Sequence, residues 1–119
     1  MKRIAILGST GSIGTQALEV IAEHLSEFSV EVLTAQNQAD LLITQALAWK
    51  PVHVVIGNEA KYAQVIEALA GTGIQVHAGA QALEEVVTLD SVDIVLTALV
   101  GYAGLLPTVK AIKAGKPIA

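Results

Sequence analysis

The chain has 119 residues, a formal net charge of −4 and no cysteine, so disulfides and thiolate chemistry are excluded within it. This length accommodates one hydrophobic core, and an acidic balance with only seven scattered Lys and Arg argues against binding to nucleic acid or to an anionic membrane. Hydrophobic residues make up 53% and aromatic residues 3%, so Ala, Val, Ile and Leu must build the core, as is typical of parallel strands covered by helices.

The first predicted elements are a strand, a glycine turn and a helix. Ile4–Leu7 is a short run of strand formers, and Gly8 interrupts it at once. Two further glycines follow, Gly11 and Gly14. Apolar residues then recur at helical spacing, at Ile13, Ala17, Val20, Ile21 and Leu25.

This glycine spacing allows a tight turn, a close approach of the backbone to a pyrophosphate, and packing of the helix on the strand. Backbone N–H groups of residues 10–13 would face an anion at the helix N-terminus, where the helix dipole favours negative charge. The hydroxyls of Ser9, Thr10 and Ser12 add donors. The turn therefore predicts a dinucleotide site, and the alternative is a tight turn without a ligand.

Strands and helices alternate along the rest of the chain. Four further strands are predicted at Phe28–Thr34, Val52–Gly57, Ile74–His77 and Val92–Thr97. Four further helices are predicted at 38–49, 58–69, 81–88 and 104–114. Asn37 and Asn58 are the expected N-caps of the second and third helices.

The alternation predicts an α/β fold of the Rossmann-like, doubly wound type, with a mainly parallel sheet and helices on both faces. We expect residues 1–119 to form one NADP-binding domain of this kind. Residues 116–119 resemble the opening of a sixth strand, so we expect the chain to be a fragment of a longer protein.

The turn after the second strand predicts which cofactor is bound. An acidic residue at this place would bind the ribose hydroxyls of NAD and repel the 2′-phosphate of NADP. Residues 34–37 are neutral, and the nearest acid, Glu31, lies back within the strand. NADP is therefore favoured, through amide donors and the N-terminus of the second helix, although no Arg or Lys stands here.

A second candidate segment, Thr97–Gly104, follows the fifth strand, and its small residues leave room for a nicotinamide ring. Gly101 and Gly104 could equally be helix-packing positions. The stretch Ile94–Val109 carries no charge, but it is shorter than the ~20 apolar residues that span a bilayer. The N-terminus lacks the apolar segment of a signal peptide, and we expect a cytoplasmic protein without membrane contact.

No catalytic or metal-binding residue is predicted. The three histidines, at positions 24, 53 and 77, lack metal-ligand spacing with one another or with carboxylates. Glu84 and Glu85 point in different directions on a helix, and the glutamates at 19, 23 and 27 form a solvated face. Any chemistry of the full protein would lie beyond Ala119.

Two separated motifs, Gly8–Leu18 and Thr97–Thr108, together with Ala111–Lys116, resemble the N-terminal domain of the 1-deoxy-D-xylulose 5-phosphate reductoisomerase family. The resemblance places NADPH contacts at the pyrophosphate on Thr10, Gly11, Ser12 and Ile13. It places contacts at the adenosine phosphate on Ala35, Gln36 and Asn37, where relatives often carry Gly-Lys-Asn or Gly-Ser-Asn. It places Ala98, Leu99 and Val100 near the nicotinamide.

The resemblance implies an enzyme that rearranges 1-deoxy-D-xylulose 5-phosphate and reduces the product with NADPH to 2-C-methyl-D-erythritol 4-phosphate for isoprenoid synthesis. It also implies a homodimer with a small sugar phosphate substrate and a divalent metal, Mg or Mn, whose carboxylate ligands lie beyond these 119 residues. The fragment alone is then expected to bind cofactor without turnover. Two alternatives are another NADP enzyme of the semialdehyde dehydrogenase type and a non-catalytic nucleotide-sensing domain.

Overall fold

The computed structural model describes residues 1–98 and 114–118, and the strands among them form one sheet in the order β4-β3-β2-β1-β5. Every neighbouring pair is parallel. The strands are β1 (Lys2–Leu7), β2 (Phe28–Ala35), β3 (His53–Ile56), β4 (Gln75–Ala78) and β5 (Ile94–Thr97). The helices are α1 (Ser12–Ala22), α2 (Ala39–Trp49), α3 (Tyr62–Ala68) and α4 (Ala80–Val86), with a 3₁₀ turn, η1 (Glu59–Lys61), before α3.

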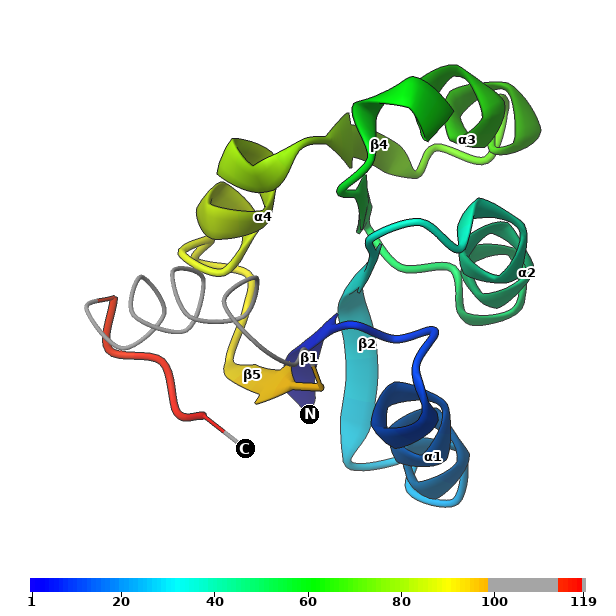
Figure 1. The fold of residues 1–119 in the computed structure, drawn as a ribbon. Helices are drawn as coiled ribbons and strands as arrows, with labels where there is room; N and C mark the ends of the chain where they lie inside the picture. The colour runs from blue at the N-terminus through cyan, green and yellow to red at the C-terminus, as the bar shows by residue number, and fades with distance from the viewer. Residues whose placement is uncertain (99–113, 119) are drawn as a thin grey trace.

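Helices cover both faces of the sheet, which confirms the predicted doubly wound fold. Helices α1, α2 and α3 lie on one face and α4 on the other (Figure 1). Successive crossovers from β1 to β4 run in one direction, and the chain then returns across the sheet to place β5 on the other side of β1. The switch point is therefore at the carboxyl ends of β1 and β5, where this type of fold binds ligands.

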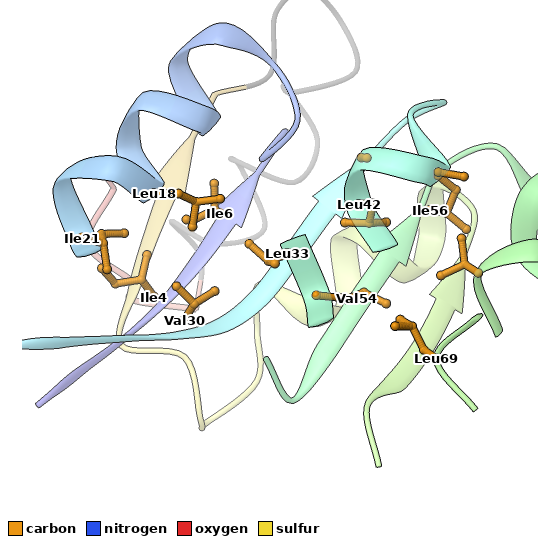
Figure 2. Packing of buried hydrophobic residues seen from close by; sticks show 14 residues of the cluster. Ile4, Ile6, Leu18, Ile21, Val30, Leu33, Leu42, Val54, Ile56 and Leu69 are labelled. Carbon is orange, nitrogen blue, oxygen red and sulfur yellow. The ribbon is translucent and has the colours of Figure 1, made fainter. Parts of the chain in front are cut away.

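Aliphatic side chains fill the core on the α1–α3 face. Leu18 and Ile21 of α1 pack over Ile4, Ile6 and Val30 of the first two strands (Figure 2). A smaller cluster lies beneath α4, with Ala5, Leu7, Val32, Val55, Leu83 and Val95 among its members. No helix among residues 1–98 and 114–118 has the length and hydropathy needed to cross a bilayer.

The buried face of α1 differs from the predicted one. Gly14, Leu18 and Ile21 are buried, whereas Ile13, Val20 and Leu25, expected on the apolar face, are 58%, 56% and 57% exposed. Gly14 has no side chain, and a Cβ there would lie 2.6 Å from Cα of Ser9, so the helix approaches the preceding turn very closely at this residue. The buried face of the helix is therefore centred on Gly14, Leu18 and Ile21, and Ile13 lies on the exposed side.

Other boundaries shift modestly. The third predicted helix is divided into η1 and the seven-residue α3. The fourth begins at Ala80 and ends at Val86, before the predicted Thr88. Ile118 forms a parallel bridge with Val95, in keeping with a sixth strand next to β5. The helix expected at 104–114 lies outside the described residues except for its last position.

Candidate functional site

Two glycines of the turn after β1 are required by its backbone. Gly8 adopts φ = 83°, a left-handed conformation that other residues enter only with strain. A Cβ on Gly14 would lie 2.6 Å from Cα of Ser9 and closer still to the carbonyl oxygen of Gly8. The first turn of α1 can approach the glycine turn this closely only because position 14 has no side chain.

A buried polar network fastens this turn to β2 and α2. The backbone N–H of Gly8 donates to Oγ1 of Thr34 (2.9 Å), and the N–H of Ser9 donates to the Thr34 carbonyl (2.8 Å). The Ser9 hydroxyl lies 2.7 Å from Oε1 of Gln45, whose Nε2 donates to the Ser9 carbonyl (2.9 Å). The expectation that the Ser9 hydroxyl is a ligand donor is therefore wrong, because its proton is used inside the protein.

Gln45 is a structural residue that the sequence analysis did not identify. It lies among apolar residues on the buried face of α2, next to Ala46 and one turn from Leu42. A lone amide at a buried helical position was the available signal, since buried polar groups almost always have hydrogen-bond partners. Its partner, Ser9, is 36 residues away in the sequence.

The N-terminus of α1 presents free backbone donors. The N–H of Gly11 is already used, because it donates to the Gly8 carbonyl (3.3 Å). The N–H groups of Ser12 and Ile13 have no hydrogen-bond partner within residues 1–98 and 114–118. A Cβ on Gly11 would meet only the Gly8 oxygen, at 3.8 Å, so nothing described in the protein crowds this position. The predicted donor set of residues 10–13 thus loses the N–H of Gly11 but keeps those of Ser12 and Ile13.

The predicted site residues in this region lie together at the surface. Gly11, Ser12 and Ile13 are exposed and Thr10 is half-buried. Ile13 lies in the first turn of α1, beside the free N–H groups. The free N–H groups of Ser12 and Ile13 and the uncrowded Gly11 suit a pyrophosphate, and the exposed Ile13 side chain suits a less polar part of the same ligand.

The turn after β2 is joined to the turn after β3. The N–H of Gly57 donates to the Ala35 carbonyl and the N–H of Asn58 to the Gln36 carbonyl, both at 2.8 Å. The Gln36 side chain lies directly over the α-carbon of Gly57, so a Cβ there would collide with the amide. The backbone of the predicted adenosine site is therefore held by a neighbouring strand.

Asn37 does not cap α2 as predicted. The N-cap is Gln38, which makes no side-chain cap bond, and the Asn37 side chain turns to the neighbouring loop. There its Oδ1 accepts from Nδ2 of Asn58 at 3.0 Å. The other predicted cap is confirmed in part, because Oδ1 of Asn58 accepts from the N–H of Ala60 and caps η1 rather than α3.

Two acidic residues lie near this turn, and the first of them, Glu31, is placed as expected. Glu31 is buried in β2 at a bulge, where Ile4 pairs with Val30 and Ala5 with Val32, so it lies away from the carboxyl edge of the sheet. Asp40 lies in the first turn of α2 and accepts from Nε2 of Gln64 at 2.6 Å. Ala35 is buried, while Gln36 and Asn37 are exposed.

The segment predicted to lie near a nicotinamide is described only at its start. The N–H of Ala98 donates to the Leu7 carbonyl at 2.8 Å, which brings the end of β5 beside the glycine turn. Leu99, Val100 and the following motif lie outside the described residues.

Two histidines meet although the sequence gave them no common role. Nδ1 of His53 lies 3.1 Å from Nε2 of His77 on the adjacent strand. Burial lowers the pKa of His53 below its usual 6.5, the charge of His77 lowers it further, and Glu31 opposes the shift. No group of three or more metal-binding side chains occurs in the part of the chain that the structure describes.

An exposed ion pair joins β1 to the residue before β5. Nε of Arg3 lies 3.1 Å from Oδ2 of Asp93, which also accepts from the Arg3 N–H at 2.8 Å. These hydrogen bonds from Arg3 lower the pKa of Asp93 to about 2. The pair lies at the amino edge of the sheet, opposite the candidate cofactor site.

Comparison with known proteins identifies the family. A family model described as 1-deoxy-D-xylulose 5-phosphate reductoisomerase matches residues 4–119. The chain belongs to the 1-deoxy-D-xylulose 5-phosphate reductoisomerase family. Reductoisomerases of Bacteroides fragilis and Phocaeicola vulgatus are 60% and 58% identical over 118 residues, which is 99% of this chain but 30% and 31% of theirs. The chain thus spans about 30% of the length of the relatives it matches.

Solved reductoisomerases share the fold. The enzyme from Zymomonas mobilis in complex with NADPH superimposes with a TM-score of 0.93 at 36% identity, covering 99% of this chain and 31% of the other. A reductoisomerase in complex with NADPH, fosmidomycin and magnesium gives a TM-score of 0.95 at 35% identity, covering 99% and 29%. The predicted family is confirmed, in preference to a semialdehyde dehydrogenase.

Proposed function

We propose that this chain is the NADPH-binding part of a 1-deoxy-D-xylulose 5-phosphate reductoisomerase. The observation that carries the proposal is the pair of free N–H groups on Ser12 and Ile13, above an uncrowded Gly11 and beside the switch point of the sheet. Relatives that share this fold are described in complex with NADPH. The cofactor pyrophosphate would accept from these amides, at the positive end of the α1 dipole.

The contacts divide between two turns. Thr10, Gly11, Ser12 and Ile13 would hold the pyrophosphate, while Ala35, Gln36 and Asn37 would receive the adenosine ribose and its 2′-phosphate. No carboxylate of the described residues is on the turn after β2 itself, so a 2′-phosphate meets amides there and not a like charge. Ala98, Leu99 and Val100 would face the nicotinamide.

The full-length protein would use the bound hydride donor in the reductoisomerase reaction. Its substrate would be the sugar phosphate 1-deoxy-D-xylulose 5-phosphate, and its product 2-C-methyl-D-erythritol 4-phosphate. A divalent metal, Mg or Mn, would act there as a Lewis acid, and no residue of this chain is assigned to it. We further propose that the full-length protein is a cytoplasmic homodimer. In this scheme the present chain binds and orients the cofactor and performs no catalytic step itself.

Titration of the full-length protein with NADPH and with NADH tests the proposal. Nicotinamide fluorescence should report saturable binding of both, with NADPH at least several-fold tighter, and NADPH should be oxidised when 1-deoxy-D-xylulose 5-phosphate is added. Competition with 2′,5′-ADP and with 5′-AMP isolates the adenosine end, and 2′,5′-ADP should compete better. Equal affinity for the two cofactors would overturn the assignment of the turn after β2. Binding of neither would overturn the proposed function.

A further inference from the structure

A short series of hydrogen bonds fixes the direction of the exposed Asn37 carboxamide. The series begins at the backbone N–H of Ala60, which lies 3.0 Å from the side chain of Asn58. A backbone N–H can only donate, so the Asn58 atom that faces it must be the oxygen. The Ala60 N–H therefore determines which end of the Asn58 carboxamide is Oδ1 and which is Nδ2.

The next bond then has only one possible sense. With its oxygen on Ala60, Asn58 faces Asn37 with Nδ2, which must donate, at 3.0 Å. Asn37 must accept, so its Oδ1 is turned toward Asn58 and its own amino group, on an exposed side chain, faces away from that partner. The Asn37 amino group has no partner within residues 1–98 and 114–118. The turn after β2 thus presents a side-chain donor whose direction is set from the turn after β3.

We propose that Asn58 is a positioning residue that sets cofactor specificity by holding the Asn37 amino group toward the 2′-phosphate of NADPH. This inference rests on the proposed function, because it assigns the adenosine end to the turn after β2. It goes further in placing part of the specificity in a residue outside that turn, 21 positions along the chain from Asn37.

The direction of this one amide matters because the turn has no cation. Residues 35–37 carry no Lys or Arg, so phosphate recognition depends on neutral donors. The side-chain amide of Gln36 lies over the α-carbon of Gly57. The carboxylate of Asp40, also near this turn, accepts a hydrogen bond from Gln64. A reversed Asn37 would present its carbonyl oxygen to a dianionic phosphate, replacing an attraction by a repulsion. NADH has no 2′-phosphate, so its binding is insensitive to this orientation.

Asn58→Asp is the sharpest test, because it is nearly isosteric and keeps an oxygen to cap η1. It replaces the donor that faces Asn37 with an acceptor, so Asn37 must reverse to donate. Asn58→Ser is the uncharged control, which keeps a capping hydroxyl but is too short to hold Asn37. Asn37→Ala, alone and combined with Asn58→Ser, completes a double-mutant cycle. Dissociation constants for NADPH, NADH and 2′,5′-ADP are measured on each full-length variant, with thermal unfolding as a check of folding.

We expect Asn58→Asp to weaken NADPH and 2′,5′-ADP by about tenfold, the scale of one hydrogen bond to a charged group, while NADH changes less than twofold. Asn58→Ser should show a smaller loss in the same direction, and it should have no further effect when Asn37 is already Ala. Equal weakening of NADPH and NADH, or an unchanged ratio in Asn58→Asp, would overturn the inference. A wild-type protein that binds neither cofactor would instead overturn the proposed function, so the two failures are distinct.

Discussion

The two turns of the candidate cofactor site are built by different means. The turn after β1 is fixed by buried contacts, with Gly14 against the backbone of Ser9 and with the Ser9–Gln45 hydrogen bonds beneath it. In the turn after β2, Gln36 and Asn37 are exposed, and within residues 1–98 and 114–118 the contacts of their side chains are with the loop that follows β3. The first turn offers backbone N–H groups, which nearly every residue type has, whereas the second offers side-chain amides, which a single substitution can remove.

This difference separates affinity from selectivity. The pyrophosphate is common to NADH and NADPH, so main-chain donors that bind it would bind both cofactors without distinguishing between them. The 2′-phosphate belongs to NADPH alone, and in the proposed site it would meet the turn after β2, so that turn would discriminate between the two cofactors. Damage to the first turn should therefore weaken both cofactors together, and damage to the second should change their ratio.

The largest effect is expected from Gly14→Ala in the full-length protein. Helix propensity alone would favour Ala by about 1 kcal/mol, but the new Cβ would overlap the backbone of Gly8 and Ser9, which cannot rotate away. Overpacking of this kind costs about 1–3 kcal/mol, so thermal unfolding should move to lower temperature and both cofactors should bind more weakly.

Gly11→Ala is the matched control, because a Cβ there meets only one atom, at 3.8 Å. Its unfolding temperature should stay near that of wild type, while NADPH and NADH lose affinity by a similar factor as the methyl group approaches the pyrophosphate. A Gly14→Ala protein as stable as wild type would contradict the described packing of α1 on the turn.

An intermediate effect is expected from Gln45→Leu. This change leaves the Ser9 carbonyl without its partner in a buried place, which costs about 1–3 kcal/mol of unfolding free energy. Denaturant unfolding measures the loss, and cofactor titration should show NADPH and NADH weakened by the same factor. Gln81→Leu, at an exposed amide of α4, should change stability by less than about 0.5 kcal/mol. A changed NADPH-to-NADH ratio in Gln45→Leu would mean that the two turns are not independent.

The smallest effect is expected from pH and arises at β3 and β4. Folding lowers the pKa of His53 below 6.5, so the unfolded chain binds this proton more readily. The contribution to stability is complete above pH 6.5 and is lost as the pH falls from 6.5 through the lower pKa of the folded state. Thermal unfolding followed from pH 8 to pH 5 should show this decline, and His53→Phe should reduce it.

The stability contribution of the Arg3–Asp93 ion pair can be distinguished from that of His53 because the two change in different pH ranges. The Asp93 pKa is lowered to about 2 from 3.8, so its contribution is present above pH 3.8 and is lost as the pH falls through about 2. It therefore stays constant between pH 8 and pH 5. A decline in that range that persists in His53→Phe would assign the effect to another group.

The sequence by itself determined the alternation of strands and helices, the parallel sheet and the glycine turn after the first strand. These features follow from local chemistry, since runs of Ile, Val and Leu favour buried strands and Gly8 supplies the positive φ that the turn needs. The buried face of α1 was predicted less well, because hydrophobic periodicity cannot show that the helix packs closely on the preceding turn at Gly14, a residue without a side chain.

Only the tertiary structure decided which polar side chains meet. Ser9 reaches Gln45 across 36 residues, Asn37 reaches Asn58 across 21, and His53 reaches His77 across 24. The Asn37 and His53 pairs form because the parallel sheet brings neighbouring strands together in a register that is a property of the whole sheet. The Ser9 pair forms because α2, which carries Gln45, packs on the sheet near the glycine turn. A linear pattern can place a residue at the end of a strand, but the partner that fixes its orientation comes from another strand or helix.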